Sequence, residues 1–318
     1  MLNDLKIIGH KNILKYLSGI VESGSLNHAY LFSGAVGLGK TRVVKNFIAS
    51  IMQQNEFDQN NSDVKWVALL EEKKDILIEQ IQELQRFLAL STFNNGHKIV
   101  VIDEADKMNK EAVNCLLKIL EEPPKNVILI LITSAEDRLL KTIISRCQKI
   151  SFLPISKKEL TDGLITIFGE KDLSKIDLVA KLSQGKPELA IQLMQDDKFF
   201  AQYQKETQQL TSFVLDDIND RMKLATKVLD KKSFNESREV VDEILDKLSL
   251  IFHDILSLKL GVEEYVVGSF AHEEFNRLVQ KYNLAKLKEV FTKITEAKKN
   301  LSVSVTPKMV LQNLVINL

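Results

Sequence analysis

The chain of 318 residues contains only two cysteines, Cys115 and Cys147. Two cysteines cannot build a disulfide framework, so the sequence fits a reducing cytoplasm. The chain also lacks any run that approaches the roughly 20 apolar residues needed to span a bilayer. Its first residues have no basic segment leading into an apolar stretch, and we therefore expect no signal peptide. These absences favour a globular cytoplasmic protein over the secreted and membrane classes.

Net charge is absent as well, because 43 Lys and Arg residues balance 43 Asp and Glu residues. A neutral chain lacks the long-range attraction for phosphates that a dedicated DNA-binding protein uses. We therefore expect contact with DNA only through a local patch or through a larger assembly. The length exceeds what one hydrophobic core usually organises, and it indicates two or three domains.

Strand-like and helix-like segments alternate through the first half of the chain. The run KIVVID is rich in β-branched residues, as in parallel strands that are covered on both faces. Alternation of this kind predicts an α/β fold with a parallel sheet. We expect strands at 28–32, 64–70, 98–103, 127–133 and 148–152, and helices at 11–23, 40–53, 76–90, 109–121 and 138–144.

Proline is scarce after Pro154, and no further strand pattern follows it. Only Pro187 and Pro307 interrupt the helical periodicity, and both can occupy the first turn of a helix. The predicted fold class is therefore α/β followed by all-α. The apolar spacing is that of an ordinary bundle core, and an exposed interface between subunits is the alternative. We expect helices near 156–168, 174–183, 187–195, 198–229, 235–260, 271–281, 284–299 and 306–317.

One loop carries the strongest chemical signal. The segment GAVGLGKT matches the pattern G-x-x-x-x-G-K-[ST] and stands between a predicted strand and a predicted helix. In such loops, here with Gly34, Gly37 and Gly39, backbone N–H groups surround phosphate oxygens at a helix N-terminus. Lys40 would reach the β- and γ-phosphates of ATP, and the hydroxyl of Thr41 would bind Mg²⁺. The alternative is a glycine-rich turn that binds nothing, which the flanking strand and helix disfavour.

Two acidic residues provide the second half of this site. Asp103 and Glu104 stand at the end of the predicted strand KIVVID and directly after it. Asp103 would hold Mg²⁺, directly or through water, and Glu104 would orient and polarise the attacking water. Taken alone, such residues usually belong to a solvated loop. Their position supports the site, because ligands of open α/β sheets bind at the carboxyl ends of the strands.

Three segments together resemble the AAA+ clamp-loader family of bacteria and eukaryotes. The Ser-Arg-Cys triplet that ends the third segment is the most specific feature. The segments are HAYLFSGAVGLGKT (28–41), NCLLKILEEPP (114–124) and ILITSAEDRLLKTIISRC (130–147). The resemblance implies three domains: an AAA+ P-loop α/β domain at 1–153, a small helical lid at 154–205, and a C-terminal helical collar domain for oligomerisation at 206–318.

The resemblance also implies roles for single residues. Arg146 matches the arginine finger of the family, which enters the ATP site of the adjacent subunit and stabilises charge on the transferring phosphoryl group. Thr133 matches the polar sensor-1 position, with Ser134 as the neighbouring alternative. Ile8 and Gly9 match the segment that lies against the adenine. The structural alternatives are a surface arginine at a strand–helix junction for Arg146 and a hydroxyl bonded to nearby backbone for Thr133.

Motor subunits of the gamma/tau type differ from this chain at one site position. They carry a sensor-2 arginine where this chain has Glu188, and an anion there would repel the γ-phosphate. Delta subunits usually lack both the phosphate loop and the triplet, which this chain has. The resemblance therefore favours a subunit that serves a neighbour's ATP site, with a gamma/tau-type motor ATPase as the alternative. We expect the chain to bind ATP and Mg²⁺ and to be a weak ATPase at most.

The resemblance further implies partners and a task. The partners are gamma/tau and delta clamp-loader subunits of DNA polymerase III, the sliding clamp, and primer–template DNA reached through the assembled complex; no membrane partner is implied. The task is loading the clamp onto primed DNA during replication. Many members carry a four-cysteine zinc module after the P-loop helix, but residues 52–66 contain no cysteine, so no zinc is expected. A non-catalytic adaptor that keeps its nucleotide and a general AAA+ remodeller are weaker alternatives.

Overall fold

The chain forms two compact units. The α/β unit runs to Asp172 and takes in Gly185–Leu189, and the helical unit comprises Leu173–Gln184 and Ala190–Leu318. Within the described residues, no helix is both long and apolar enough to cross a membrane. The computed structural model describes residues 7–70, 73, 75–90, 92, 96–170, 172–230, 232–262, 266–267, 272–302 and 305–318.

Five parallel strands build the sheet of the α/β unit. The strands are β1 (Ala29–Ser33), β2 (Val64–Val67), β3 (Lys98–Ile102), β4 (Val127–Thr133) and β5 (Gln148–Ser151). They lie in the order β2-β3-β4-β1-β5, and every neighbouring pair is parallel. All residues of β1, β3 and β4 are buried, as expected for strands that are covered on both faces. The prediction of a parallel α/β sheet is therefore confirmed.

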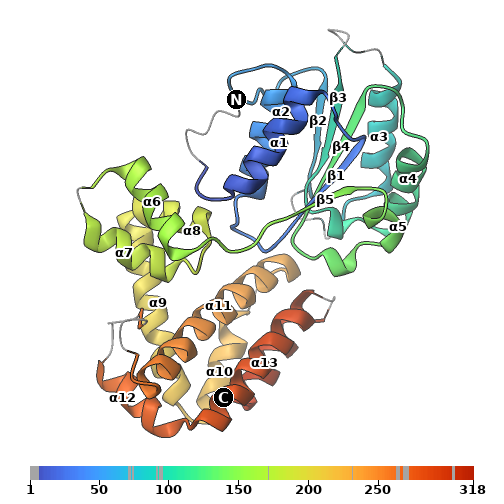
Figure 1. Cartoon of the computed structure of the whole chain (residues 1–318). Helices are drawn as coiled ribbons and strands as arrows, with labels where there is room; N and C mark the ends of the chain where they lie inside the picture. The colour runs from blue at the N-terminus through green and yellow to red at the C-terminus, as the bar shows by residue number, and fades with distance from the viewer. Residues whose placement is uncertain are drawn as a thin grey trace. The chain divides into compact units, whose positions relative to one another are not determined.

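Helices cover both faces of this sheet, α1 and α2 on one side and α3 and α4 on the other (Figure 1). Tyr30 of β1 packs edge-on against Phe47 of α2, with ring centroids 5.3 Å apart. The next residue, Leu31, points to the opposite core, because side chains alternate along a strand. The helices are α1 (Lys11–Ser23), α2 (Lys40–Ile51), α3 (Ile78–Ala89), α4 (Lys110–Glu121) and α5 (Lys141–Ile144).

Several elements of the α/β unit are shorter than predicted, among them one strand and one helix. The strand expected at 64–70 ends three residues early, where its partner strand β3 also ends. The helix expected at 138–144 is replaced by a 3-10 turn, Glu136–Arg138, and the short helix α5. The helix cannot run through because Leu139, which is buried in the core, takes an extended backbone conformation.

The helical unit confirms the all-α prediction for the second half of the described chain. Phe252 and Tyr282 pack edge-on at its core, with ring centroids 5.2 Å apart, among buried aliphatic residues such as Leu245 and Val290. The first turn of α8 belongs to the α/β unit. The helices are α7 (Leu173–Leu182), α8 (Pro187–Gln195), α9 (Asp197–Leu215), α10 (Ile218–Val228), α11 (Phe234–Lys259), α12 (His272–Lys281), α13 (Leu284–Ser302) and α14 (Pro307–Ile316).

The single helix predicted at 198–229 is wrong, because the chain breaks there into α9 and α10. Asp217 takes an extended conformation between the two helices. Its carboxylate accepts hydrogen bonds from the backbone N–H groups of Asn219 (2.8 Å) and Asp220 (3.0 Å). An aspartate that caps the free N–H groups in this way starts a new helix.

Candidate nucleotide site

The glycine loop joins the end of β1 to the start of α2. A Cβ atom at Gly34 would lie 2.5 Å from the carbonyl oxygen of Phe152, so only glycine fits there. Gly37 and Gly39 have φ angles of 82° and 83°, in the left-handed region that favours glycine. Lys40 is the first residue of α2. The loop therefore presents backbone N–H groups and the positive end of a helix, the arrangement that binds phosphate.

A hollow of about 150 Å³ lies beside this loop. Two further residues that line it are exposed: Ser134 after β4, and Glu188 at the start of α8. Residues from three strand ends line the hollow because β4 lies between β1 and β3. The carboxyl ends of these parallel strands therefore lie at one edge of the sheet. Of the predicted site residues, the hollow is lined by Gly37, Gly39, Lys40, Thr41, Asp103, Glu104 and Thr133.

Lys40 turns back onto its own loop. Its Nζ donates hydrogen bonds to the backbone oxygens of Gly34 (2.6 Å) and Ala35 (2.7 Å). Burial lowers the pKa of this ammonium group, and the negative charges of Glu188 and Asp103 oppose the shift. These carbonyl oxygens thus accept hydrogen bonds from the N–H groups of Lys40 that would otherwise donate to phosphate oxygens. A phosphate bound in the hollow would have to replace these carbonyl oxygens as the partner of the lysine.

The two acidic residues after β3 have different surroundings. Burial raises the pKa of the Asp103 carboxyl, and the backbone N–H of Glu104 at 3.0 Å and the charge of Lys40 act against that rise. Glu104 has a left-handed backbone with φ of 52°, and its carboxylate pairs with the ammonium of Lys107 at 2.5 Å. To polarise a water molecule, the Glu104 carboxylate would have to leave this lysine.

The hydroxyl of Thr133 both donates and accepts a hydrogen bond within the protein. The hydroxyl donates to Oδ1 of Asp106 at 2.6 Å and accepts from the backbone N–H of Ala135 at 3.0 Å. The side chain is buried at the end of β4. The structural alternative for Thr133, a hydroxyl bonded to nearby backbone, is thus present in the structure. Sequence reasoning missed Asp106, because its bond to Thr133 spans 27 positions of the chain.

The two residues predicted to lie against the adenine do not line the hollow. Ile8 is buried, and a Cβ at Gly163 of α6 (Lys157–Phe168) would clash with it. Gly9 lies so close to Ile155 that a Cβ at this position would lie 2.5 Å from the Ile155 side chain. This segment is therefore fixed against α6 and the chain that precedes it.

His10 links this segment to the glycine loop, and sequence reasoning did not single it out. Its Nε2 donates a hydrogen bond to the carbonyl oxygen of Leu38 at 2.8 Å. Its ring lies edge-on to Phe152, with centroids 4.7 Å apart. No sequence signal marked His10 beyond its place directly after the predicted adenine segment.

We expect His10 to lower the thermal stability of the chain as the pH drops below 6.5, the ordinary pKa of histidine. Burial lowers the pKa of His10 below that value, so the folded state binds the proton less readily than the unfolded state. The contribution of His10 is therefore complete above pH 6.5 and is lost as the pH falls through the lowered pKa. Unfolding midpoints measured between about pH 7.5 and 5 check this. His10→Gln, which does not titrate, should show a shallower decline, and equal slopes would contradict the assignment.

Arg146 lies apart from the residues that line the hollow. It follows α5, and its guanidinium donates to the carbonyl oxygen of Thr142 and to the carboxylate of Glu121, both at 3.0 Å. The side chain is 35% exposed. The adjacent Cys147 is partly buried and packs against the core that contains residues of α3 and α4, and burial raises the pKa of its thiol to about 12. The triplet thus combines a partly buried anchor with an accessible guanidinium.

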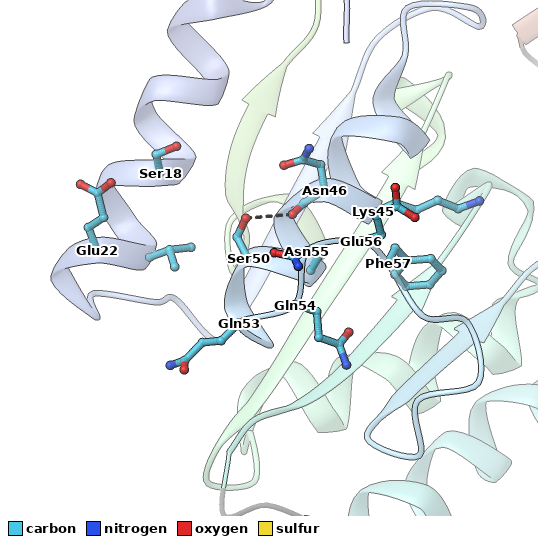
Figure 2. A pocket seen from close by; sticks show the side chains of 12 residues that line it. Ser18, Glu22, Lys45, Asn46, Ser50, Gln53, Gln54, Asn55, Glu56 and Phe57 are labelled. Carbon is cyan, nitrogen blue, oxygen red and sulfur yellow. Dashed lines mark hydrogen bonds between the residues drawn. The ribbon is translucent and has the colours of Figure 1, made fainter. Parts of the chain in front are cut away.

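A second, larger hollow of about 440 Å³ lies at the C-terminal ends of α1 and α2 (Figure 2). Polar side chains from both helices line it, among them Glu22 and Lys45, and Figure 2 shows the Ser50 hydroxyl bonded to the carbonyl oxygen of Asn46. None of the predicted site residues lines this hollow. In the described part of the chain, no group of three or more His, Cys, Asp or Glu side chains could hold a metal ion.

The fold and the smaller hollow together define a class of protein. A parallel sheet carries a phosphate loop after β1, acidic residues after β3 and a polar residue at the end of β4, and helices follow the sheet. This is the arrangement of a P-loop protein of the AAA+ class.

Comparison with known proteins shows which proteins of this class the chain resembles. A family model described as "DNA polymerase III, delta subunit" matches residues 9–156. The delta-prime subunit of DNA polymerase III from Bacillus subtilis is 29% identical over 96% of this chain and 95% of its own length. The gamma subunit from Buchnera aphidicola is 31% identical over 48% of this chain and 46% of its own. A replication factor C small subunit from Methanococcus maripaludis is 24% identical over 82% of this chain and 84% of its own length.

The chain is therefore similar to subunits of DNA polymerase III and of replication factor C. The delta-prime subunit from Bacillus subtilis aligns with it along nearly the whole of both chains.

Proposed function

We propose that the chain acts as the delta-prime subunit of a DNA polymerase III clamp loader, which loads the sliding clamp onto primed DNA. Its main chemical contribution is Arg146, which enters the ATP site of the adjacent gamma/tau motor subunit and stabilises charge on the transferring phosphoryl group. The observation that carries this proposal is the placement of Arg146. Its guanidinium does not line the chain's own hollow, is accessible to a neighbouring chain, and follows a segment anchored in the core.

The chain's own hollow, in this proposal, binds ATP with Mg²⁺ and turns it over slowly. Lys40 holds the β- and γ-phosphates, and Thr41 and Asp103 hold the metal ion. Two features support weak hydrolysis. The carboxylate of Glu104 is paired with a lysine, and the anion of Glu188 stands at the hollow, where motor subunits have an arginine.

Assembly completes the proposal. The α/β domain at 1–153 and the lid at 154–205 take one end of an arc of subunits that includes gamma/tau and delta. The domain at 206–318 packs with its counterparts as a collar. Exposed apolar side chains on two contacting helices support such an interface: Leu224 and Val228 on α10, and Met309 and Ile316 on α14. ATP binding then closes the arc onto the clamp and primer–template DNA, and hydrolysis releases them.

Reconstitution tests this function directly. The chain is mixed with gamma/tau and delta subunits, and loading of a labelled clamp onto primed DNA is measured with and without it. We expect stable incorporation and loading that requires the chain. Nucleotide affinity and turnover of the isolated chain are measured in parallel. Rapid hydrolysis by the chain alone would favour the motor ATPase, and loading that does not depend on the chain would refute the proposal.

Glu188→Gln should tighten ATP binding by the isolated chain. The substitution removes a negative charge that stands at the hollow and would repel the phosphates. Two charges about 4 Å apart in water interact by about 1 kcal/mol, so we expect roughly fivefold tighter binding. Titration with a fluorescent ATP analogue measures the change, and added salt should reduce it. Unchanged affinity at low salt would show that Glu188 does not face the phosphates.

A further inference from the structure

We infer that Glu121 is a positioning residue for Arg146, which holds the finger in one orientation before a neighbour's ATP arrives. This inference rests on the trans role proposed for Arg146. The two side chains come from different elements, α4 and the turn after α5, and are 25 positions apart in the chain.

The hydrogen bonds of Arg146 leave part of its guanidinium available. One terminal nitrogen donates to the carbonyl oxygen of Thr142, and the other donates to Glu121. A guanidinium has five N–H donors in a rigid plane, so three remain after these two bonds. The carbonyl and the carboxylate fix the plane, and the remaining donors can meet phosphate oxygens.

The backbone that carries each support of Arg146 is fixed by packing. Glu121 is the last residue of α4, which is anchored just before it by the buried Ile119 and Leu120. Thr142 belongs to the short helix α5, which is anchored by the fully buried Ile143. The C-terminal end of a helix also attracts a cation, because its free carbonyl groups carry partial negative charge. The guanidinium is thus held between two elements whose backbones are anchored in the core.

The ion pair has little to contribute to folding, because both side chains are partly exposed and screened by water. The ion pair instead restricts the conformations of the arginine side chain. A long side chain without this partner samples many rotamers, and it would lose that freedom each time it engaged a phosphate. Removing Glu121 should therefore slow catalysis at the neighbouring site and leave the fold intact.

The test uses the assembled loader and measures ATP hydrolysis at the site next to this chain. Glu121→Ala should lower kcat about threefold to tenfold, with the KM for ATP and the unfolding midpoint unchanged. Glu121→Gln keeps an acceptor oxygen and should recover part of the loss. Glu122→Ala, which removes the adjacent exposed carboxylate, should match the unmodified chain. In the Arg146→Ala background, Glu121→Ala should have no further effect.

The outcomes separate this inference from the proposed function. If Arg146→Ala leaves hydrolysis unchanged, the trans role itself is wrong. If Arg146→Ala slows hydrolysis but Glu121→Ala behaves like Glu122→Ala, the trans role stands and the positioning role is wrong. A faster rate in Glu121→Ala also overturns it, because Glu121 would then restrain the finger. An equal loss with and without Arg146 would show that Glu121 acts through something else.

Discussion

Arg146→Ala should slow ATP hydrolysis at the adjacent motor site by about a thousandfold. Arginine fingers supplied in trans contribute about 10³ to 10⁵ in kcat, because they stabilise charge that develops only in the transition state. ATP affinity at that site should change little by comparison. The loss should appear in kcat, and clamp loading should slow with it.

In a loader with several ATP sites, hydrolysis at the other sites masks a loss of hydrolysis at one of them. The measurement therefore has to isolate the site adjacent to this chain. Single-turnover hydrolysis is followed in a loader whose other motor sites are silenced by substitution of their phosphate-loop lysines. Arg146→Lys keeps the charge but not the planar fork, and we expect it to recover little of the rate. Lys141→Ala removes an exposed positive charge from α5, on the same surface segment, and serves as the control. If Lys141→Ala and Arg146→Ala lose the same amount, general electrostatics rather than a finger explains the effect.

The sheet could be predicted because each strand carries its own signal. Strands buried on both faces need nearly continuous apolar runs, and VILILIT of β4 has seven buried residues in a row. The break between α9 and α10 could not be predicted in the same way. Apolar periodicity continues on both sides of Asp217, and a capping aspartate and an exposed helical aspartate look alike in sequence. Only the backbone conformation at that residue separates them.

The candidate site shows the same division. The loop residues could be found because phosphate binding imposes their spacing, and strand order then brings Asp103 and Thr133 to them. The partners that modify their chemistry could not be found. The pairing of Glu104 with Lys107 depends on a left-handed residue followed by a 3-10 turn. Contacts of this kind depend on local backbone geometry that residue spacing does not encode.

Lys40→Ala should weaken ATP binding by the isolated chain roughly 10- to 100-fold, the range for a lost hydrogen bond to a charged group. The lysine is the buried cation at the hollow and begins the helix that faces it. Isothermal titration of the chain with ATP and Mg²⁺ measures the loss. The substitution also removes the donor that Gly34 and Ala35 share, so a small drop in the unfolding midpoint should accompany it.

The pH dependence distinguishes a lost charge from a damaged loop. Burial lowers the pKa of Lys40, so the unmodified chain should lose ATP affinity as rising pH deprotonates the ammonium, at lower pH than for a free lysine. Lys40→Ala should bind weakly without that decline, and Lys15→Met, which changes an exposed lysine on α1, should behave like the unmodified chain. If Lys40→Ala keeps full affinity, the hollow is not the nucleotide site. The effect of Arg146→Ala on the neighbouring site would still stand, because that guanidinium does not line the hollow.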